Sequence, residues 1–264
     1  MVGRKIALSS IIIAALLLSF PMLSMHRGDG PWPSWLGIAC AQVINYDTLK
    51  SGADAEKAER MADPLEPLNR FWFKFNDGFY FWVLKPVAKA CKTIIPEPIR
   101  IATDNASYNF RFPIRFVNNL LQLKLEGAGT ELLSFAVNST IGCGGLFEPA
   151  QKEFHLKRYR EDFGQTLGFY GMPPVMFIVW PLLGPSSLRD SIGRAGDNFT
   201  GGLFWLSNYD VIEWYESAAI VAGDQVNYTS LHLGEYEDFK RSALDPYVSM
   251  RSVYYQYREN LVQQ

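Results

Sequence analysis

A catalytic reaction would need reactive side chains at a suitable spacing, and this chain offers few of them. Residues 184–187 (Gly-Pro-Ser-Ser) depart from the G-x-S-x-G pattern of a nucleophile elbow. The sequence contains no Walker A run and no G-x-G-x-x-G motif after a predicted strand. His155 and His232 each stand alone, so a metal site or a Ser–His or Cys–His pair lacks partners.

Three aspartates, Asp162, Asp190 and Asp197, have side chains suited to general acid or base catalysis. Each lies beside an arginine or at a predicted helix start, where a charge partner or a helix cap is the simpler role. We therefore predict that the protein is not an enzyme and that it uses no cofactor and no metal ion.

The composition limits the class of protein. The 264 residues suffice for one large domain or two small ones. A net charge of −2 excludes a broad basic surface, so we expect no nucleic-acid partner. Aromatic residues make up 14% of the chain and charged residues only 20%, which is low for a soluble domain. The aromatic excess therefore needs a structural explanation.

The first residues are typical of an export signal. Arg4 and Lys5 precede residues 6–25, which are uncharged and rich in Leu, Ile and Ala. An uncleaved membrane anchor is the alternative, since the segment is just long enough to span a bilayer. Pro21 and the polar residues 26–30 interrupt the segment and favour a cleaved signal.

Two cleavage sites remain open. Cys40 follows the small residue Ala39, as in a lipoprotein signal, although Gly37 stands where that signal has Leu. The same stretch (Ala-Cys-Ala) satisfies the A-x-A pattern, which would leave Gln42 as the first mature residue. Cys40 is therefore either a lipidation candidate or part of the removed signal.

The domain boundaries follow from this leader. Residues 1–41 are the predicted signal segment, and residues 42–62 are small and polar and predict a solvated tether. Residues 63–66 (Asp-Pro-Leu-Glu) have the capping aspartate, first-turn proline and return glutamate of a helix start. We expect one helical domain over residues 63–264.

Eight of the twelve residues from 71 to 82 are aromatic. They surround most of a helical wheel, and such a helix is either deeply buried or exposed to lipid. Trp and Tyr favour the membrane–water boundary, and Lys74 and Asp77 argue against a full span. The predicted membrane anchors are Phe71, Trp72, Phe79, Trp82 and, later in the chain, Trp180.

Prolines divide the middle of the chain into short helices. Pro86, Pro96, Pro98 and Pro113 separate predicted helices at residues 87–95, 99–110 and 114–122. A helix at residues 132–141 follows. It ends at Gly142, Gly144 and Gly145, which predict either a hinge or a helix C-cap.

Residues 163–188 carry no charge, yet they cannot form a membrane span, because four prolines interrupt them. Their longest apolar piece, residues 175–180, would rise only ~9 Å as a helix, against a hydrocarbon core of ~30 Å. The charged residues 147–162 predict a solvated loop. Strand-like alternation is scarce, so the fold class is mainly α. A capping box at residues 187–190 precedes a predicted helix at residues 189–198. Further helices are predicted at residues 210–231 and after residue 246.

Beyond the leader, the cysteines are Cys91 and Cys143, and no short spacing pairs them. Two unpaired, buried thiols are the simpler prediction. A disulfide formed in an oxidising compartment is the alternative.

Seven strings in order resemble the pattern of the MlaA (VacJ) family. They are residues 63–70 (DPLEPLNR) with 75–76 (FN), 84–88 (LKPVA), 118–122 (NNLLQ), 138–145 (NSTIGCGG), 161–168 (EDFGQTLG), 184–190 (GPSSLRD), and 245–247 (DPY) with Arg251. One such string would be weak, but seven in sequence order are specific.

The resemblance implies a ring of short, proline-broken helices in the inner leaflet of the outer membrane, on its periplasmic face. Such proteins enclose an amphipathic channel, associate with trimeric porins, and pass misplaced outer-leaflet phospholipid to the periplasmic carrier MlaC. A charged headgroup in hydrocarbon needs polar partners, so we expect polar side chains along the channel. The candidates are Asn69, Arg70, Asn76, Asn118, Gln122, Asn138 and Gln165. For each of them, a helix cap or a buried hydrogen bond is the alternative role.

Two other functions compete with lipid transfer. A structural membrane-interface protein without transport would share the aromatic residues and need no lined channel. A lipid hydrolase would need a catalytic triad, which the sequence does not supply.

Overall fold

The structure is a computed structural model that describes residues 62–264. The predicted signal segment with Cys40, and residues 42–61 of the predicted tether, lie outside the described residues. The elements in chain order are α4 (Glu66–Phe79), the π-helical segment η2 (Tyr80–Leu84), α5 (Lys85–Ile94), α6 (Glu97–Phe110), α7 (Phe112–Leu121), α8 (Leu125–Thr140), α9 (Pro149–Lys152), α10 (Phe163–Phe169), β1 (Phe177–Trp180), β2 (Gly184–Ser187), α11 (Leu188–Thr200), α12 (Gly202–Asn208), α13 (Trp214–Leu231), α14 (Glu235–Ser242) and α15 (Pro246–Val262).

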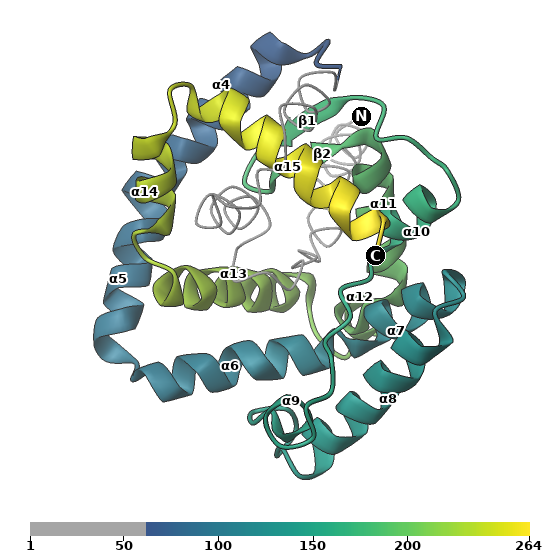
Figure 1. The fold of residues 1–264 in the computed structure, drawn as a ribbon. Helices are drawn as coiled ribbons and strands as arrows, with labels where there is room; N and C mark the ends of the chain where they lie inside the picture. Colours follow the sequence, from purple (N-terminus) through teal and green to yellow (C-terminus); the bar gives the residue numbers. More distant parts are fainter. Residues whose placement is uncertain (1–61) are drawn as a thin grey trace, which may run out of the picture.

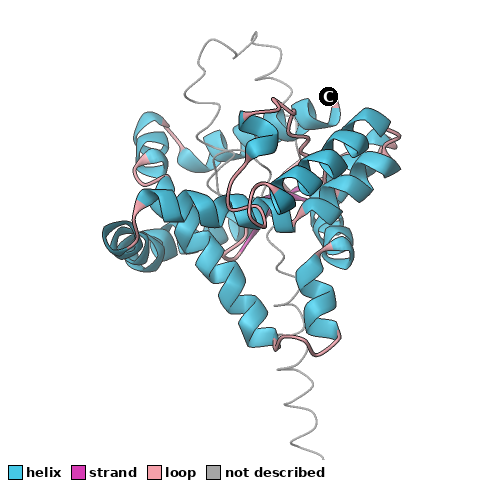
Figure 2. Cartoon of the chain, turned by 90° about the horizontal axis from the view of Figure 1, so that it is seen from below, coloured by secondary structure: helices cyan, strands magenta, loops and turns pink. Residues whose placement is uncertain are grey.

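The helices follow one another around a ring (Figure 1). In this view α4 and α5 form the left side, α6 the lower side, and α7, α10 and α11 the right side, while α15 crosses the top. α13 packs against α5 and α6. Figure 2 shows that the helices are short and lie at many angles, with a single small hairpin of strands within residues 62–264. The predicted mainly α, ring-like body is confirmed.

Contacts between the first and last described elements close this ring. Arg70 on α4 donates to Asp245, the N-cap of α15, at 3.0 Å. Arg251 on α15 donates to Asp63 at 3.0 Å, and the hydroxyl of Tyr247 donates to the same carboxylate oxygen. The beginning of the domain is therefore held by its C-terminal helix.

The two predicted capping boxes have different outcomes. Ser187 caps α11, since its hydroxyl accepts from the N–H of Asp190 at 3.0 Å. The capping role predicted for Asp63 is wrong: α4 begins at Glu66 without a side-chain cap. The carboxylate of Asp63 instead accepts from three side chains, two of them on α15, which a local sequence pattern cannot reveal.

Most proline breaks are confirmed, but the one at Pro86 is wrong. Pro96 is the N-cap of α6, and Pro113 lies in the first turn of α7. At Pro86 the helical backbone continues from α4 through η2 into α5. In η2 the N–H of Lys85 bonds to the carbonyl of Tyr80, five residues earlier. This wider π turn accommodates the proline, which has no N–H and would crowd the preceding turn of an α-helix.

Three further elements differ from the sequence prediction. Residues 177–187 form an antiparallel hairpin, in which Trp180 pairs with Gly184, and this hairpin was not predicted. α8 begins at Leu125 rather than at residue 132. It packs closely on α7 at Gly127, where a Cβ would lie 2.0 Å from Oδ1 of Asn119. α13 begins at Trp214 rather than at residue 210.

The apolar core is small and strongly aromatic. It lies where α4, η2, the hairpin, α13, α14 and α15 meet, and its members are Tyr80, Leu84, Phe177, Val179, Tyr228, Tyr236, Phe239, Tyr247, Met250 and Tyr254. Tyr80 meets Tyr236 edge to face at a ring-centroid distance of 4.8 Å, a favoured aromatic geometry. Five of these ten side chains are tyrosines, each with a hydroxyl that requires a polar partner inside the protein.

Candidate functional site

Polar side chains fill much of the interior of this protein, and apolar ones cover much of its surface. Within residues 62–264, 29 polar or charged residues are buried against 16 hydrophobic ones, and 34 large hydrophobic residues are exposed. A soluble protein normally buries its large apolar side chains and leaves charged ones outside. Exposed apolar surface of this extent marks a membrane or protein contact.

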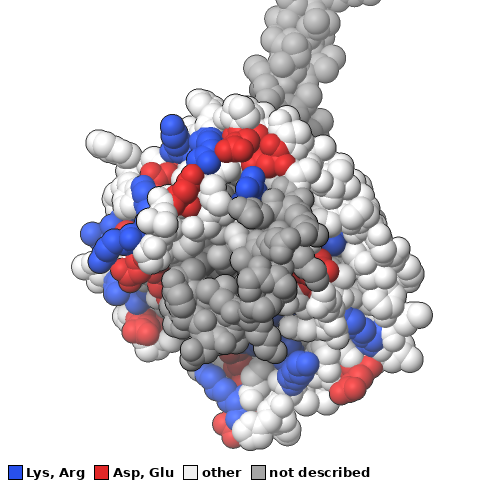
Figure 3. Space-filling model, turned by 45° about the horizontal axis from the view of Figure 1, so that its top comes forward, with Lys and Arg blue, Asp and Glu red and all other residues white. Residues whose placement is uncertain are grey.

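The exposed apolar side chains are distributed along most of the ring helices. They include Leu68 and Phe75 on α4, Trp82 and Val83 on η2, Ile94 on α5, Ile99 on α6, Leu120 and Leu121 on α7, and Leu132 and Leu133 on α8. In Figure 3 charged side chains lie along the upper, left and lower edges of one face, and its right side is mostly uncharged. The surface thus combines a charged rim with large areas suited to an apolar environment.

The predicted membrane anchors separate into two groups. Phe71 is 59% exposed, Trp82 85% and Trp180 40%, so these three side chains are free to enter an apolar phase. Trp72 and Phe79 are half-buried and pack against the aromatic core. The structure therefore favours the exposed three as anchors, and the anchoring role itself remains a prediction.

Buried ion pairs, here named the Asp–Arg cluster, join the elements α10, α11 and α15. The cluster consists of Asp162, Arg189, Asp190, Tyr254 and Arg258. Arg258 donates to Asp162 at 2.5 and 2.8 Å and to Asp190 at 2.9 and 3.0 Å. Arg189 donates to Asp190 at 3.1 Å, and the hydroxyl of Tyr254 donates to the same carboxylate.

The electrostatics of the cluster favour a structural role for its carboxylates. Burial alone would raise the pKa of Asp190, but Arg258 and Arg189 outweigh burial and lower it. Burial opposes the charge on Arg258, yet Asp162 and Asp190 raise its pKa well above the ordinary value. Burial and the charge of Asp190 raise the pKa of Tyr254, so its hydroxyl stays protonated. The predicted charge-partner role of the two aspartates is confirmed.

The prediction that residues 147–162 form a solvated loop is wrong in part. Glu148, Glu161 and Asp162 are buried. Asp162 also caps α10 by accepting from the N–H of Gln165 at 2.7 Å. A run of charged residues resembles a solvated segment in sequence. Here Glu161 pairs with Lys124 and Asp162 with Arg258, both from other parts of the chain, while Glu148 pairs with Arg158 of the same segment.

A second buried network joins α7 to α10 and α11. The amide of Asn118 donates to Asp197 at 2.9 Å and accepts from the hydroxyl of Thr166 at 2.8 Å. Gln122, one turn further on, donates to Glu161 at 2.8 Å and to Thr166 at 3.1 Å. These bonds satisfy both side-chain amides within the protein.

Asn69 and Asn76 attach the β-hairpin to α4. They lie seven residues apart, which places them on one face of the helix two turns from each other. Each amide both donates to and accepts from the backbone of the hairpin region. Their partners are the backbone groups of Phe177, Val179, Trp180 and Leu182, at 2.7 to 3.0 Å.

The remaining amide candidates are also bonded inside the protein. Asn138 donates to Gln151 at 3.0 Å and accepts from the N–H of Ala150 at 3.0 Å, which fixes α9 against α8. Gln165 donates to Asp162 at 3.0 Å and to the carbonyl of Arg160 at 2.5 Å. Both side chains therefore fold the segment between α8 and α10 onto its neighbours.

Arg70 differs from the other six polar candidates because it is partly exposed. It pairs with Glu66 at 2.7 Å and lies 4.4 Å from the ring centroid of Tyr247. The other six candidates are buried. Asn69 and Asn76 bond to the hairpin, Asn118 and Gln122 belong to the network of α7, and Asn138 and Gln165 hold the segment between α8 and α10. These hydrogen bonds supply the alternative, structural role. Channel lining by any of the seven stays a prediction.

The glycine turn after α8 is held by hydrogen bonds. The N–H of Gly144 bonds to the carbonyl of Ser139 at 3.0 Å, and that of Gly145 to Asn138 at 2.8 Å. Gly144 and Gly145 have φ of +74° and +92°, which favours glycine. A Cβ on Gly145 would lie 2.4 Å from the Cβ of Asn109. These features agree with the C-cap alternative, and the hinge stays a prediction.

The ion pair between Arg115 and Glu131 was missed by the sequence analysis. Both residues are buried, Arg115 donates to Glu131 at 2.9 Å, and its guanidinium lies 3.7 Å from the ring centroid of Tyr108. The hydroxyl of Tyr108 donates to Glu131 at 3.1 Å. Single charges within otherwise apolar helices were the available signal, but the sequence does not tell which charges meet.

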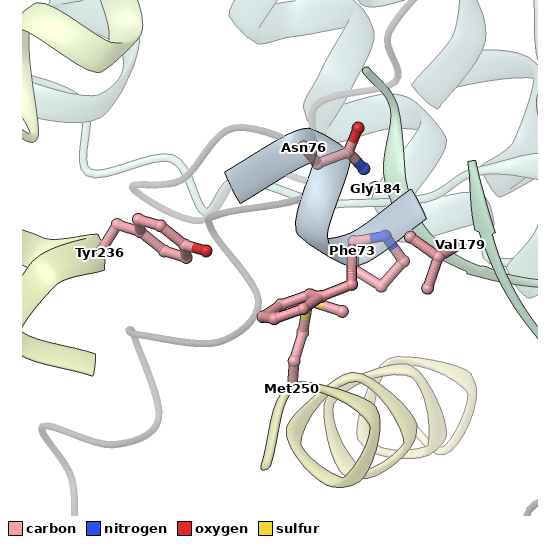
Figure 4. Close-up of a pocket in the computed structure, with 7 residues that line it drawn as sticks. Phe73, Asn76, Val179, Gly184, Tyr236 and Met250 are labelled. Carbon is pink, nitrogen blue, oxygen red and sulfur yellow. The ribbon is translucent and has the colours of Figure 1, made fainter. Parts of the chain in front are cut away.

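A small cavity lies where α4, the hairpin, α14 and α15 meet (Figure 4). It has room for about one water molecule. Its lining consists of Phe73, Asn76, Val179, Gly184, Pro185, Tyr236 and Met250. In Figure 4 the ring of Tyr236 lies across from Phe73, and Met250 lies below Phe73. The lining is mostly apolar.

No helix within residues 62–264 is both long and apolar enough to cross a membrane. The same residues contain no group of three or more His, Cys, Asp or Glu that could hold a metal ion. Cys91 and Cys143 are free thiols, but the predicted burial is wrong for both: Cys91 is half-buried and Cys143 is exposed.

The ring of short helices, the polar interior and the apolar surface are typical of helical proteins that contact a membrane or a protein partner through their surface. The match to known sequences is more specific. Residues 61–261 match the profile of the MlaA lipoprotein family, and the chain belongs to that family.

Curated relatives from Haemophilus influenzae and Escherichia coli carry the name intermembrane phospholipid transport system lipoprotein MlaA. The Haemophilus influenzae protein is 31% identical over 83% of this chain and 86% of its own length. The Escherichia coli protein is 30% identical over 83% of this chain and 84% of its own length. A solved structure, described as the structural basis for maintenance of bacterial outer membrane lipid asymmetry, matches with a TM-score of 0.64 and 28% identity, over 76% of this chain and 99% of that one.

Proposed function

We propose that this protein is the outer-membrane component of an intermembrane phospholipid transport system. In this role it removes misplaced phospholipid from the outer leaflet and passes it to a periplasmic carrier, which maintains lipid asymmetry. Membership of the MlaA family and the names of its relatives support the proposal. The observation that carries it is the reversed distribution of polarity, with 34 large hydrophobic residues exposed over a polar interior.

The proposed location is the periplasmic face of the outer membrane, with the helical domain of residues 63–264 inserted in one leaflet. The longest helical run, residues 66–94 through α4, η2 and α5, carries charged residues along most of its length, and charges in a hydrocarbon core are costly. Short helices that join their polar groups internally suit a body that enters the membrane without crossing it. Labelling of single-cysteine variants from outside intact cells tests this placement. With porins blocked, labelling across the helical body would contradict it.

The proposed partners are phospholipid, a trimeric porin and a soluble periplasmic carrier similar to MlaC. The apolar areas outside the charged rim offer space for both lipid and porin. Cross-linking in native outer membranes, followed by mass spectrometry, tests the porin. Cross-links to the porin trimer are expected at exposed apolar positions, and their absence under conditions that capture lipid would contradict this partner.

The transport activity is tested with purified protein in vesicles of phosphatidylethanolamine and phosphatidylglycerol. The carrier from the same bacterium is added outside, and its lipid load is measured by extraction and mass spectrometry. We expect the load to exceed that from protein-free vesicles, with the lipid chemically unchanged. Hydrolysed lipid would favour a hydrolase, and an unchanged load would contradict transport.

A second candidate function is a structural membrane-interface protein without transport. The observation that favours it is the internal bonding of six predicted channel amides, which leaves these groups engaged within the protein. This candidate predicts membrane binding equal to that of a transporter but no loading of the carrier. The same vesicle assay therefore separates the two functions.

A further inference from the structure

Helix α13 consists of a buried half and an exposed half. The buried half is anchored to the ring: Asp224 accepts from Arg111 at 2.6 Å, and most of the residues that follow it on α13 are buried. In the exposed half, residues 214–223, Ser217 alone is buried. The preceding helix α12 has no buried residue. Together these exposed parts, residues 202–223, form a projection that we name the aromatic arm.

The aromatic arm extends away from the ring over a length that matters for a membrane. At the bottom of Figure 2, two helices leave the ring and meet in a loop; by their place in Figure 1 they are α13 on the left and α12 on the right. The C-terminus lies at the opposite, upper edge of that view. At about 1.5 Å per residue, the ten residues 214–223 extend about 15 Å. This length is half of a hydrocarbon core of ~30 Å, which corresponds to one leaflet.

Polarity changes along the aromatic arm. Its two helical legs, residues 202–208 and 217–223, carry no charge. Its tip, residues 209–216, carries exposed acidic residues, two of which also form the capping box of α13: Asp210, Glu213 and Glu216. Exposed apolar and aromatic side chains lie at or near the same tip: Trp205, Tyr209, Val211, Trp214 and Tyr215. The tip is therefore both apolar and acidic.

Neither water nor hydrocarbon suits this tip completely. In water its aromatic rings would form an exposed apolar patch, which in proteins marks a contact surface. In hydrocarbon its three carboxylates would be costly, because charged groups there need water or a partner. Trp and Tyr favour the boundary between headgroups and acyl chains, where carboxylates stay hydrated. The tip therefore suits the headgroup boundary, and the uncharged legs suit the hydrocarbon next to it.

We propose that the aromatic arm crosses the leaflet that the ring does not enter and places its tip at the far headgroup boundary. The ring itself stays in one leaflet, and the arm is the part that contacts lipid of the other. The inference rests on the proposed function and adds to it the segment that reaches the outer leaflet. A tip in water, exposed to a soluble protein, is the competing placement.

Depth-dependent quenching in phosphatidylcholine vesicles tests the placement. A bimane-labelled cysteine is introduced at an exposed position of the tip, Val211→Cys, or of the leg, Ile220→Cys, in the variant Cys91→Ser/Cys143→Ser. The vesicles contain lipid with a nitroxide either on the headgroup or near the end of an acyl chain. We expect the headgroup nitroxide to quench position 211 more strongly and the deep nitroxide to quench position 220 more strongly. The variant without an added cysteine measures background labelling.

A third labelled position and two double variants serve as controls. Leu244→Cys lies between the charged residues Arg241 and Asp245 and should be quenched by iodide in the water phase and not by the nitroxides. Trp214→Ser/Tyr215→Ser should lower headgroup quenching at position 211, with an unchanged melting temperature in detergent because both side chains are exposed. Leu132→Ser/Leu133→Ser, which removes exposed side chains from α8, should leave quenching at position 211 unchanged.

Three results would overturn the proposal. Quenching of position 211 by iodide alone would place the tip in water. Strongest quenching of both positions by the deep nitroxide would place the tip inside the hydrocarbon core. Strongest quenching of both positions by the headgroup nitroxide would lay the arm along one surface of the membrane.

The proposal and the function on which it rests can fail separately. If the unaltered protein loads the carrier while position 211 is quenched by iodide alone, the placement of the arm is wrong and transport stands. If the expected depth order is found while the carrier is never loaded, the arm crosses the leaflet and the transport function is wrong.

Discussion

Removal of the Arg258 guanidinium is the most direct test of how this protein stabilises its polar interior. Arg258→Met keeps much of the side-chain volume and leaves Asp162 and Asp190 buried without their main counterion. In the structure this arginine makes four hydrogen bonds of 2.5 to 3.0 Å to the two carboxylates. Loss of one partner of a buried ion pair costs about 3–5 kcal/mol.

This free energy corresponds to a large change in melting temperature. For a domain of 150–250 residues, 1 kcal/mol changes the melting temperature by about 2–4 °C, so we expect Arg258→Met to lower it by roughly 6–20 °C. Arg241→Met is the control. Its pair with Asp238 is 77% exposed on the arginine side, and such pairs contribute about 1 kcal/mol or less.

The pH dependence of the loss checks its cause. Since the folded protein lowers the pKa of Asp190, the pairing contributes fully above the ordinary value of 3.8 and is lost as the pH falls through the lowered value. In Arg258→Met the unpaired carboxylates should take up protons at higher pH. The difference between variant and unaltered protein should therefore be largest near pH 7.5 and shrink toward pH 4.

Tryptophan fluorescence during heating in dodecyl maltoside measures these changes. The combined variant Arg258→Met/Asp162→Asn/Asp190→Asn should recover part of the loss, because it removes the uncompensated charges. A change below about 2 °C for Arg258→Met, or a combined variant no more stable than the single one, would refute the reasoning.

Three further predictions concern the surface, one carboxyl group and the glycine turn. The double variant Phe71→Ser/Trp82→Ser should be retained less in sedimented membranes, with an unchanged melting temperature in detergent. Trp72→Ser, by contrast, should lower the melting temperature. Loss of cooperative melting in the double variant would show that Phe71 and Trp82 belong to the core. Burial, and then Asp238, raise the pKa of Glu235 to about 7, so ionisation opposes folding progressively above pH 4.5 and fully above pH 7. Glu235→Gln should therefore stabilise the protein at pH 8 but not at pH 4. Because solvent screens this side chain, the gain at pH 8 should be no more than about 1 kcal/mol. Equal effects at both pH values would contradict the raised pKa. A proline at position 144 cannot adopt φ of +74° and removes the N–H that bonds to Ser139. We therefore expect Gly144→Pro to cost roughly 2–3 kcal/mol of stability and to reduce melting temperature and lipid transfer together. Lost transfer with an unchanged melting temperature would instead support a hinge.

Local chemistry in the sequence determined where several helices begin. Pro96 and Pro113 stand at the starts of α6 and α7, and Ser187 caps α11, because each effect depends on backbone groups within one helical turn. The seven ordered strings likewise indicated the family without structural information. The aromatic excess predicted contact with lipid, and Phe71 and Trp82 are exposed as that role requires.

Local chemistry was insufficient at Pro86, at Asp63 and in the hairpin. The π turn around Pro86 retains the helix, and the partners of Asp63 on α15 replace its expected capping role. The hairpin is short, and its first strand, β1, depends on Asn69 and Asn76 of α4 for backbone partners at its outer edge. In each case the deciding contact comes from outside the local sequence window.

Only the tertiary structure decided what the buried polar side chains do. Asn69 meets the carbonyl of Phe177 across 108 residues, and Arg258 meets Asp162 across 96. From sequence alone, the same asparagine suits a channel wall, a helix cap or a buried bond, and any arginine can serve any aspartate. The physical reason is that a buried polar group must find a partner within about 3 Å, and that partner is selected by proximity in space.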